Sequence, residues 1–259
     1  MNSEPTRRTI LLKVQPDVTA QAGEWPVHEQ MLGALAKQLS RAPVPGAGAP
    51  LSDAAAVLQR LVALAGDSDR QHGEYAPLDY EDVDTATDEA LGALALLHAA
   101  GSSDANPAVP AQYAGALDRL AIAIGHWAMR HGIRCLRIEP VVNALARAAN
   151  ATTSRQETAA VFALMQGLIE HCKPDFGADL ERSNPERPWR ILNLNFAITA
   201  IRTGDAALMQ FAFASLTSHL PDESRSFFLE AGETARTAGL PADLCDLIDR
   251  ELRGGQPAQ

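Results

Sequence analysis

The sequence predicts an all-α protein made of antiparallel helical hairpins, packed as a bundle or as an irregular α-solenoid-like stack. Hydrophobic residues make up 46% of the 259 residues but aromatic residues only 5%, and the apolar share is mostly Ala and Leu, which favour helix over strand. Apolar positions also recur at helical spacing in one segment after another. The connections between these segments are mostly short, which favours antiparallel neighbours.

A short stretch near the N-terminus departs from this helical pattern. TILLKV, Thr9 to Val14, has the composition of a strand and is followed by Pro16, so we expect a short N-terminal extended segment. A helix is predicted from Val27 to Arg41, and the Pro- and Gly-rich run from Ala42 to Pro50 then predicts a linker. The run lacks the Gly-Lys-Ser/Thr ending of a phosphate-binding loop.

The next predicted helix begins near Ser52 and Asp53, which are candidate N-caps, and ends near Gly66. The segment from Gly66 to Glu89 is the most acidic part of the chain, and we expect it to be a solvated loop. A helix from about Thr87 to Ala100 follows it.

The helical signal is denser in the second half of the chain. We therefore expect an N-terminal helical region with long loops, residues 1–105, and a C-terminal helical hairpin domain, residues 106–259, with one continuous domain as the alternative. Ser154 and Glu157 have the spacing of a capping box. Helices are expected from Pro110 to Gly132, from Pro140, from Ser154 to Pro174, and at about 188–203, 206–219, 222–238 and 241–252.

Charge and cysteine content exclude several classes of protein. The formal net charge is −10, which argues against general nucleic-acid binding because that affinity comes largely from Lys and Arg neutralising phosphates. The three cysteines form no Cys-x-x-Cys motif, which fits a reducing cytoplasm. The N-terminus does not read as a signal peptide, and no window has the roughly 18 unbroken apolar residues of a membrane-spanning helix. We expect a cytoplasmic protein without membrane insertion.

The sequence shows no pattern of metal-binding or catalytic residues. Neither His-Glu-x-x-His nor the Glu-x-x-His of di-iron bundles occurs, and His126 and His131 would point about 140° apart on a helix. The acidic run from Asp79 to Ala90 fails as an EF-hand, because Asp84 replaces the required glycine and Ala90 the bidentate Glu. Gly-x-Ser-x-Gly is also absent. We therefore predict no cofactor, no metal site and no catalytic residues, and an enzyme is not the favoured class.

One segment carries the turn pattern of a known helical repeat. Gly204-Asp205 is followed, seventeen residues later, by Pro221-Asp222. Phe213 lies between these two pairs, where the pattern has an aromatic residue, and Ala197 lies before them, where the pattern has a small residue. Residues 191–228 thus resemble a single degenerate tetratricopeptide repeat, in which a second helix begins after a Gly-Asp turn and ends at a proline.

The segment also departs from that family at positions that set tight helix packing, namely Asn193, Met209 and Leu216. A second alignment places Pro174 on Pro221 and gives an offset of 47 residues, which would suit a HEAT-like helix pair. A bundle or irregular stack of hairpins is therefore favoured over a regular repeat.

The best candidate for a binding surface is ERSNPERPWRILNLN, Glu181 to Asn195, because arginine beside tryptophan suits both anion recognition and interface anchors. The alternative is structural: Trp189 packs into the core, Pro188 opens a helix, and the arginines pair with Glu181 and Glu186. Buried amides in this stretch would also need partners. The predicted partner- or anion-binding residues are Arg182, Arg187, Trp189, Arg190, Asn193 and Asn195.

The sequence favours a non-catalytic cytoplasmic helical scaffold that binds another protein, whose identity it does not give; a homo-oligomer also remains open. The alternative is a small-ligand sensor or an enzyme with a pocket between helices. In that alternative Arg187 and Arg190 hold an anionic group, in a deep pocket that also reaches His126 or His171.

Overall fold

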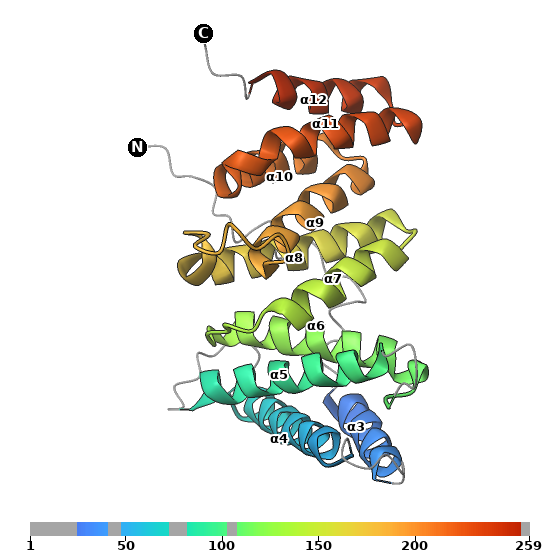
Figure 1. Ribbon diagram of the computed structural model, residues 1–259, viewed down its shortest axis with the longest axis vertical. Helices are drawn as coiled ribbons and strands as arrows, with labels where there is room; N and C mark the ends of the chain where they lie inside the picture. Colours follow the sequence, from blue (N-terminus) through green and yellow to red (C-terminus); the bar gives the residue numbers. More distant parts are fainter. Residues whose placement is uncertain (1–24, 41–47, 73–81, 103–107, 255–259) are drawn as a thin grey trace. The chain divides into compact units, whose positions relative to one another are not determined.

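The computed structural model of the protein describes residues 25–40, 48–72, 82–102 and 108–254, and every regular element in these ranges is a helix (Figure 1). The predicted all-α fold is therefore confirmed. The expected extended segment, Thr9 to Val14, lies outside the described residues, as does most of the expected linker.

Contacts divide the chain into two compact units. Unit 2 comprises Gln15–Ala148 with Glu170–Cys172, and unit 1 comprises Met1–Val14, Ala149–Ile169 and Lys173–Gln259. This division differs from the boundary expected near residue 105, which lies inside unit 2. The physical reason is that the helices on either side of that position contact each other.

Unit 2 is a set of antiparallel helices in which α3 contacts α4 and α6, α4 contacts α5, and α5 contacts α6. The core is formed largely by Leu, Ala and Ile side chains, with two tryptophans, Trp25 and Trp127, packed edge to face at 6.4 Å between ring centroids. The elements are α3 (Trp25–Leu39), α4 (Gly48–His72), α5 (Val83–Gly101), a 3-10 turn (Ala111–Tyr113), α6 (Ala114–His131) and most of α7 (Glu139–Ala151).

Helix α4 is longer at both ends than the sequence pattern predicts. It begins at Gly48, ahead of the candidate caps Ser52 and Asp53, and it continues through Gly66 to His72. A Cβ at position 66 would lie 3.4 Å from the Cβ of Trp25 on α3, which is ordinary van der Waals contact, so the helix passes this glycine without a packing requirement for it. The first seven residues of the expected acidic loop are thus helical.

The C-terminal end of α4 is held by the side chain of Asp69. Its Oδ2 accepts a hydrogen bond from Trp25 Nε1 at 2.8 Å and another from Arg130 Nη2 at 3.2 Å, and its Oδ1 lies 2.8 Å from His131 Nε2. Burial raises the pKa of Asp69, but the hydrogen bonds from Trp25 and His131 and the charge of Arg130 outweigh it and lower the pKa overall. These contacts join α3, α4 and α6.

Helix α5 begins at Val83, four residues before the predicted start. Asp84 in its first turn complements the helix dipole and also accepts a hydrogen bond from the backbone N–H of Arg134 at 3.0 Å. Asp88, one turn later, accepts the backbone N–H groups of Leu136 and Arg137 at 2.8 and 3.1 Å. Both carboxylates therefore hold the segment between α6 and α7.

In unit 1, the start of α8 has one half of the predicted capping box: Ser154 caps the helix, whereas the Glu157 carboxylate accepts a hydrogen bond from Thr152 Oγ1 at 2.6 Å. Ser154 Oγ accepts the backbone N–H of Glu157 at 3.1 Å. Pro174 was expected to end this helix, but it lies inside the last turn, and the helix ends at Phe176. The helices of unit 1 are most of α8 (Arg155–Phe176), α9 (Pro188–Thr203), α10 (Ala206–His219), α11 (Pro221–Thr237) and α12 (Ala242–Gly254).

The hairpin of α9 and α10 follows from local sequence. Gly204 ends α9 in the left-handed region, with φ 66°, where glycine carries no steric penalty. Asp205 then caps α10, and its Oδ1 accepts the backbone N–H groups of Ala207 and Leu208 at 2.8 and 3.1 Å. Pro221 occupies the first turn of α11. The bounds of α9 and α10 are those that the sequence predicts.

Candidate functional site

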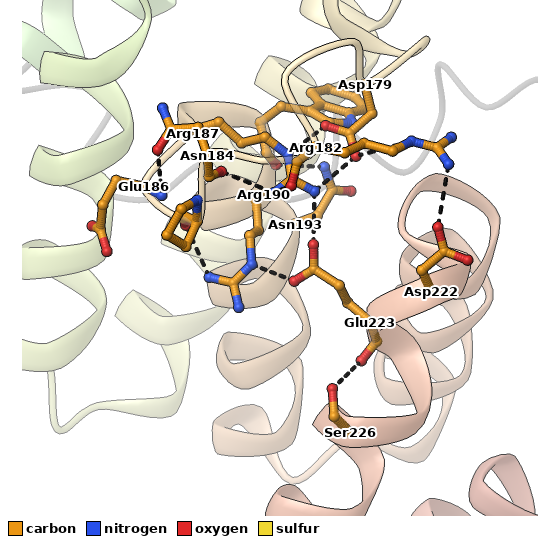
Figure 2. Close-up of polar contacts among 12 residues, drawn as sticks. Asp179, Arg182, Asn184, Glu186, Arg187, Arg190, Asn193, Asp222, Glu223 and Ser226 are labelled. Atoms are coloured by element: carbon orange, nitrogen blue, oxygen red, sulfur yellow. Dashed lines mark hydrogen bonds and ion pairs between the residues drawn. The ribbon is translucent and has the colours of Figure 1, made fainter.

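Arg187, which precedes α9, is a predicted site residue that the structure places in a closed network (Figure 2). A guanidinium carries five N–H donors. Two reach the carboxylate of Asp179, at 2.6 and 2.8 Å, and one reaches Glu223 Oε1 at 2.7 Å. The last two reach the backbone oxygens of Arg182 and Asn184, at 3.3 and 3.0 Å. No N–H of Arg187 remains for a ligand.

The burial of this network shows that it is structural. Arg187 is 4% exposed and Asp179 is also buried. The hydrogen bonds to Asp179 raise the pKa of Arg187 against the opposing effect of burial, and Glu223 adds to the rise. Asp179 adopts a positive φ of 46°, a conformation that Asp tolerates better than most residues. The network fixes the loop between α8 and α9 against the start of α11.

Arg190 and Arg182 pair with acids from the first turn of α11. Arg190 Nε donates to Glu223 Oε2, and its Nη1 donates to the backbone oxygen of Pro185 at 3.1 Å. Arg182 Nη1 donates to Asp222 Oδ2 at 3.2 Å (Figure 2). The expected pairing with Glu181 and Glu186 is therefore wrong. The partners come from elsewhere because the loop folds back onto α11.

Trp189, Asn193 and Asn195 also face inward or bond within α9. The Trp189 ring is buried against His219, with ring centroids 5.1 Å apart. Asn193 is buried; its Nδ2 donates to the backbone oxygen of Trp189 at 2.9 Å, and its Oδ1 lies 2.8 Å from His219 Nδ1. Asn195 Nδ2 donates to the backbone oxygen of Ile191 at 2.9 Å. Trp189 and Asn193 thus connect α9 to His219 on α10, whereas the Asn195 side chain bonds within α9.

A groove of about 660 Å³ lies within unit 1, between α9 and α11. Of the predicted site residues, it includes only Arg190. The two helices meet at the Arg190–Glu223 pair near their N-terminal ends. The lining is mostly apolar, and its larger apolar side chains are Leu194, Ile198, Ile201, Phe227, Leu240 and Leu244.

The groove-lining residues on α9 are the ones that sequence reasoning missed. Leu194, Ile198 and Ile201 recur every three or four residues, so they form one face of the helix, while Phe196 and Ala197 face the core. Ile198 is 42% exposed. The signal in the sequence is that α9 is apolar on more than one face, whereas a helix covering a core needs only one.

Arginines lie at both ends of the groove. Arg202, in the last turn of α9, donates to the backbone oxygens of Ala149 and Thr152 and to the side-chain oxygen of Asn150. Arg155, the first residue of α8, places its Nη2 3.8 Å from the position that a Cβ on Gly204 would occupy. Together they make the groove basic beside the C-terminal end of α9.

His126 and His171, which the alternative hypothesis invoked, belong to unit 2 and do not line this groove. Burial lowers the pKa of His126 to about 4, with a further lowering by Arg130 that Asp69 partly opposes. The His171 ring donates to the backbone oxygen of Ile133 at 2.8 Å. Within the described ranges, no group of three or more His, Cys, Asp or Glu side chains could hold a metal ion.

The chain has no recognised relatives in the comparisons with known proteins: no family model matches it, and neither the curated proteins nor the solved structures contain a match. Among the helices that the structure describes, none is long and apolar enough to cross a membrane.

Proposed function

We propose that this protein is a non-catalytic scaffold that binds another protein, and that the groove between α9 and α11 is its binding surface. The observation that carries the proposal is the row of accessible apolar side chains on α9, in which Ile198 remains 42% exposed inside a groove. Apolar side chains gathered in a concave surface with a polar rim are typical of interaction sites.

The way α9 is held supports this function. One edge of the groove is fixed by the Arg187 network, which ties the α8–α9 loop to Glu223 on α11. The other face of α9 packs on α8, where Phe162 stacks on Phe196 at 4.4 Å between ring centroids. A preformed surface loses less conformational entropy on binding than a flexible one. The resemblance of residues 191–228 to a tetratricopeptide repeat agrees with a surface built from stacked hairpins.

Two polar side chains of the groove, Ser226 and Glu223, are engaged in hydrogen bonds within the protein. Ser226 Oγ donates to the backbone oxygen of Glu223 at 2.8 Å, so its hydroxyl proton is engaged within the helix. Glu223 itself bonds to both Arg187 and Arg190. A nucleophile needs a neighbouring base free to take its proton, and neither group meets that requirement here.

A small-ligand sensor is the second candidate, because a volume of about 660 Å³ falls within the range of small-molecule pockets. Arg190 could contribute a cation to such a site, whereas Arg187 has no free N–H. The exposed lining favours the scaffold, since small-ligand sites usually bury most of their ligand. A thermal-shift screen with small anions tests the alternative.

The scaffold is tested by quantitative pull-down from lysate of the source organism with wild type, Ile198→Gln and Leu229→Gln. Leu229 is a matched control because it is an exposed aliphatic residue on α11, 54% exposed, that does not line the groove. We expect a protein that wild type and Leu229→Gln retain and Ile198→Gln loses. Identical recovery with all three, or no specific recovery, would contradict the proposal.

A further inference from the structure

We propose that the groove recognises an acidic amphipathic segment of the partner protein, with one Asp or Glu side chain held between Arg155 and Arg202. This inference rests on the proposed scaffold function and adds the chemistry of the segment that is bound.

Arg155 and Arg202 both line the groove, as does Gly204 at the C-terminal end of α9. Arg155 Nη2 is 3.8 Å from the position of a Cβ on Gly204, and Arg202 is two residues before that glycine. Arg190 is at the other end, twelve residues before Arg202, which corresponds to about 18 Å along a helix. A bound segment that contacts both ends therefore meets two different electrostatic environments.

Only one end of the groove has its positive charge neutralised by a carboxylate. Arg190 is paired with Glu223. Arg202 bonds only to neutral oxygens, those of Ala149, Asn150 and Thr152. Within the described residues, no carboxylate lies within ion-pair distance of either Arg155 or Arg202.

Arg202 retains donors that a carboxylate could use. Its three hydrogen bonds involve Nη1 twice and Nη2 once, so Nε–H and one N–H of Nη2 have no partner in the part of the chain that the structure describes. Arg155 is exposed. Because guanidinium and carboxylate form charge-assisted hydrogen bonds, an acidic side chain is the group that this end complements best.

The apolar row determines the rest of the segment. Leu194, Ile198 and Ile201 lead along α9 towards Arg202, and Phe227 faces the groove from α11. Ser226, Glu230, Thr234 and Ala238 line the groove and are exposed, so it is open along α11. An open, elongated surface fits an extended length of chain with an apolar face better than it fits a compact small molecule.

Arg155→Glu is the most informative variant. Arg155 is the first residue of α8, where an acidic side chain complements the helix dipole, so the fold should be kept. The control is Arg225→Glu, which makes the same charge change at an exposed arginine of α11 that does not line the groove. Circular dichroism and thermal unfolding of both variants establish that they fold like wild type.

The test is selection from a phage-displayed library of random 16-residue peptides on the purified full-length chain. We expect wild type and Arg225→Glu to enrich peptides with an Asp or Glu at a fixed spacing from apolar residues. Such a peptide should bind Arg155→Glu at least about tenfold more weakly, and the same library on Arg155→Glu should enrich Lys or Arg at the acidic position.

Two outcomes would overturn the inference. In the first, the enriched peptides are apolar, bind wild type and Arg155→Glu equally, and do not bind Ile198→Gln. The groove would then bind protein segments without recognising an acidic side chain, which supports the scaffold function but contradicts the acidic segment. No groove-dependent enrichment would also overturn it, and the pull-down with Ile198→Gln and Leu229→Gln would decide the scaffold separately.

Discussion

Asp179 and Arg187 form a buried ion pair through two parallel hydrogen bonds, with Arg187 Nε 2.6 Å from Oδ1 and Nη2 2.8 Å from Oδ2. Because Arg187 also bonds to Glu223, this pair connects the α8–α9 loop to α11. Glu223 in turn bonds to Arg190 at the edge of the groove. The shape of the groove thus depends on a pair of residues that do not line it.

Removing Arg187 should destabilise the protein strongly. Arg187→Ala leaves the Asp179 carboxylate buried without its partner, which costs about 3–5 kcal/mol of unfolding free energy. Arg182→Ala is the control, because the Arg182 side chain is exposed and its ion pair with Asp222 should contribute less than about 1 kcal/mol. Urea unfolding followed by circular dichroism measures both. If Arg187→Ala and Arg182→Ala lowered the unfolding free energy by the same amount, that result would count against a structural role for Arg187.

Gly125 on α6 allows close approach of α7. A Cβ at this position would lie 2.6 Å from Val141 Cγ1 and 3.1 Å from Cγ2. Gly125→Ala should therefore lower the unfolding free energy by about 1–3 kcal/mol despite the better helix propensity of alanine. A Cβ on Gly33, in α3, would have no atom within 4 Å, so Gly33→Ala should raise the unfolding free energy by up to about 1 kcal/mol. A stabilising Gly125→Ala in thermal unfolding would disprove the close packing.

Two histidines of unit 2 should make the protein acid-sensitive. Burial, aided by Arg119, lowers the pKa of His28 from 6.5 to about 4, and burial, aided by Arg130, does the same for His126. The unfolded chain therefore binds more protons than the folded one as pH falls from 6.5 towards 4. The stability present above pH 6.5 is lost across that window, by about 3 kcal/mol for each histidine.

The acid sensitivity is measured by urea unfolding at several pH values between 7 and 4. His28→Phe removes one titrating group while keeping an aromatic ring next to Trp25, whose ring centroid is 6.0 Å from that of His28. The slope of unfolding free energy against pH should become shallower in this variant. An unchanged slope would mean that His28 does not titrate as its burial requires.

The helix boundaries that sequence predicted best are those set by neighbouring residues. Gly204 and Asp205 determine a C-cap and an N-cap through their own backbone and side chain, and the structure has the expected hairpin there. The end of α4 was misplaced because Gly66 looks like a helix stop. The helix continues past it to Asp69, whose side chain contacts Trp25 on α3 and Arg130 and His131 on α6, and a local pattern does not contain these long-range contacts.

The candidate site was harder to predict for the same reason. The stretch around Arg187 stands out in the sequence, but its role depends on Glu223, which follows it by 36 residues. Ile198 looks like any other core residue of an apolar helix. Only the packing of α9 shows that this face remains open while Phe196 is buried. Composition predicted the fold class, and tertiary packing decided which residues are accessible.

The most direct measurement is site-specific photo-crosslinking in cells of the source organism. A benzophenone-bearing phenylalanine analogue is placed at position 198, inside the groove, or at position 229, an exposed position outside it. The scaffold predicts a discrete crosslink to another protein from position 198 and none from position 229. No crosslink from position 198, or the same products from both positions, would contradict a protein-binding groove between α9 and α11.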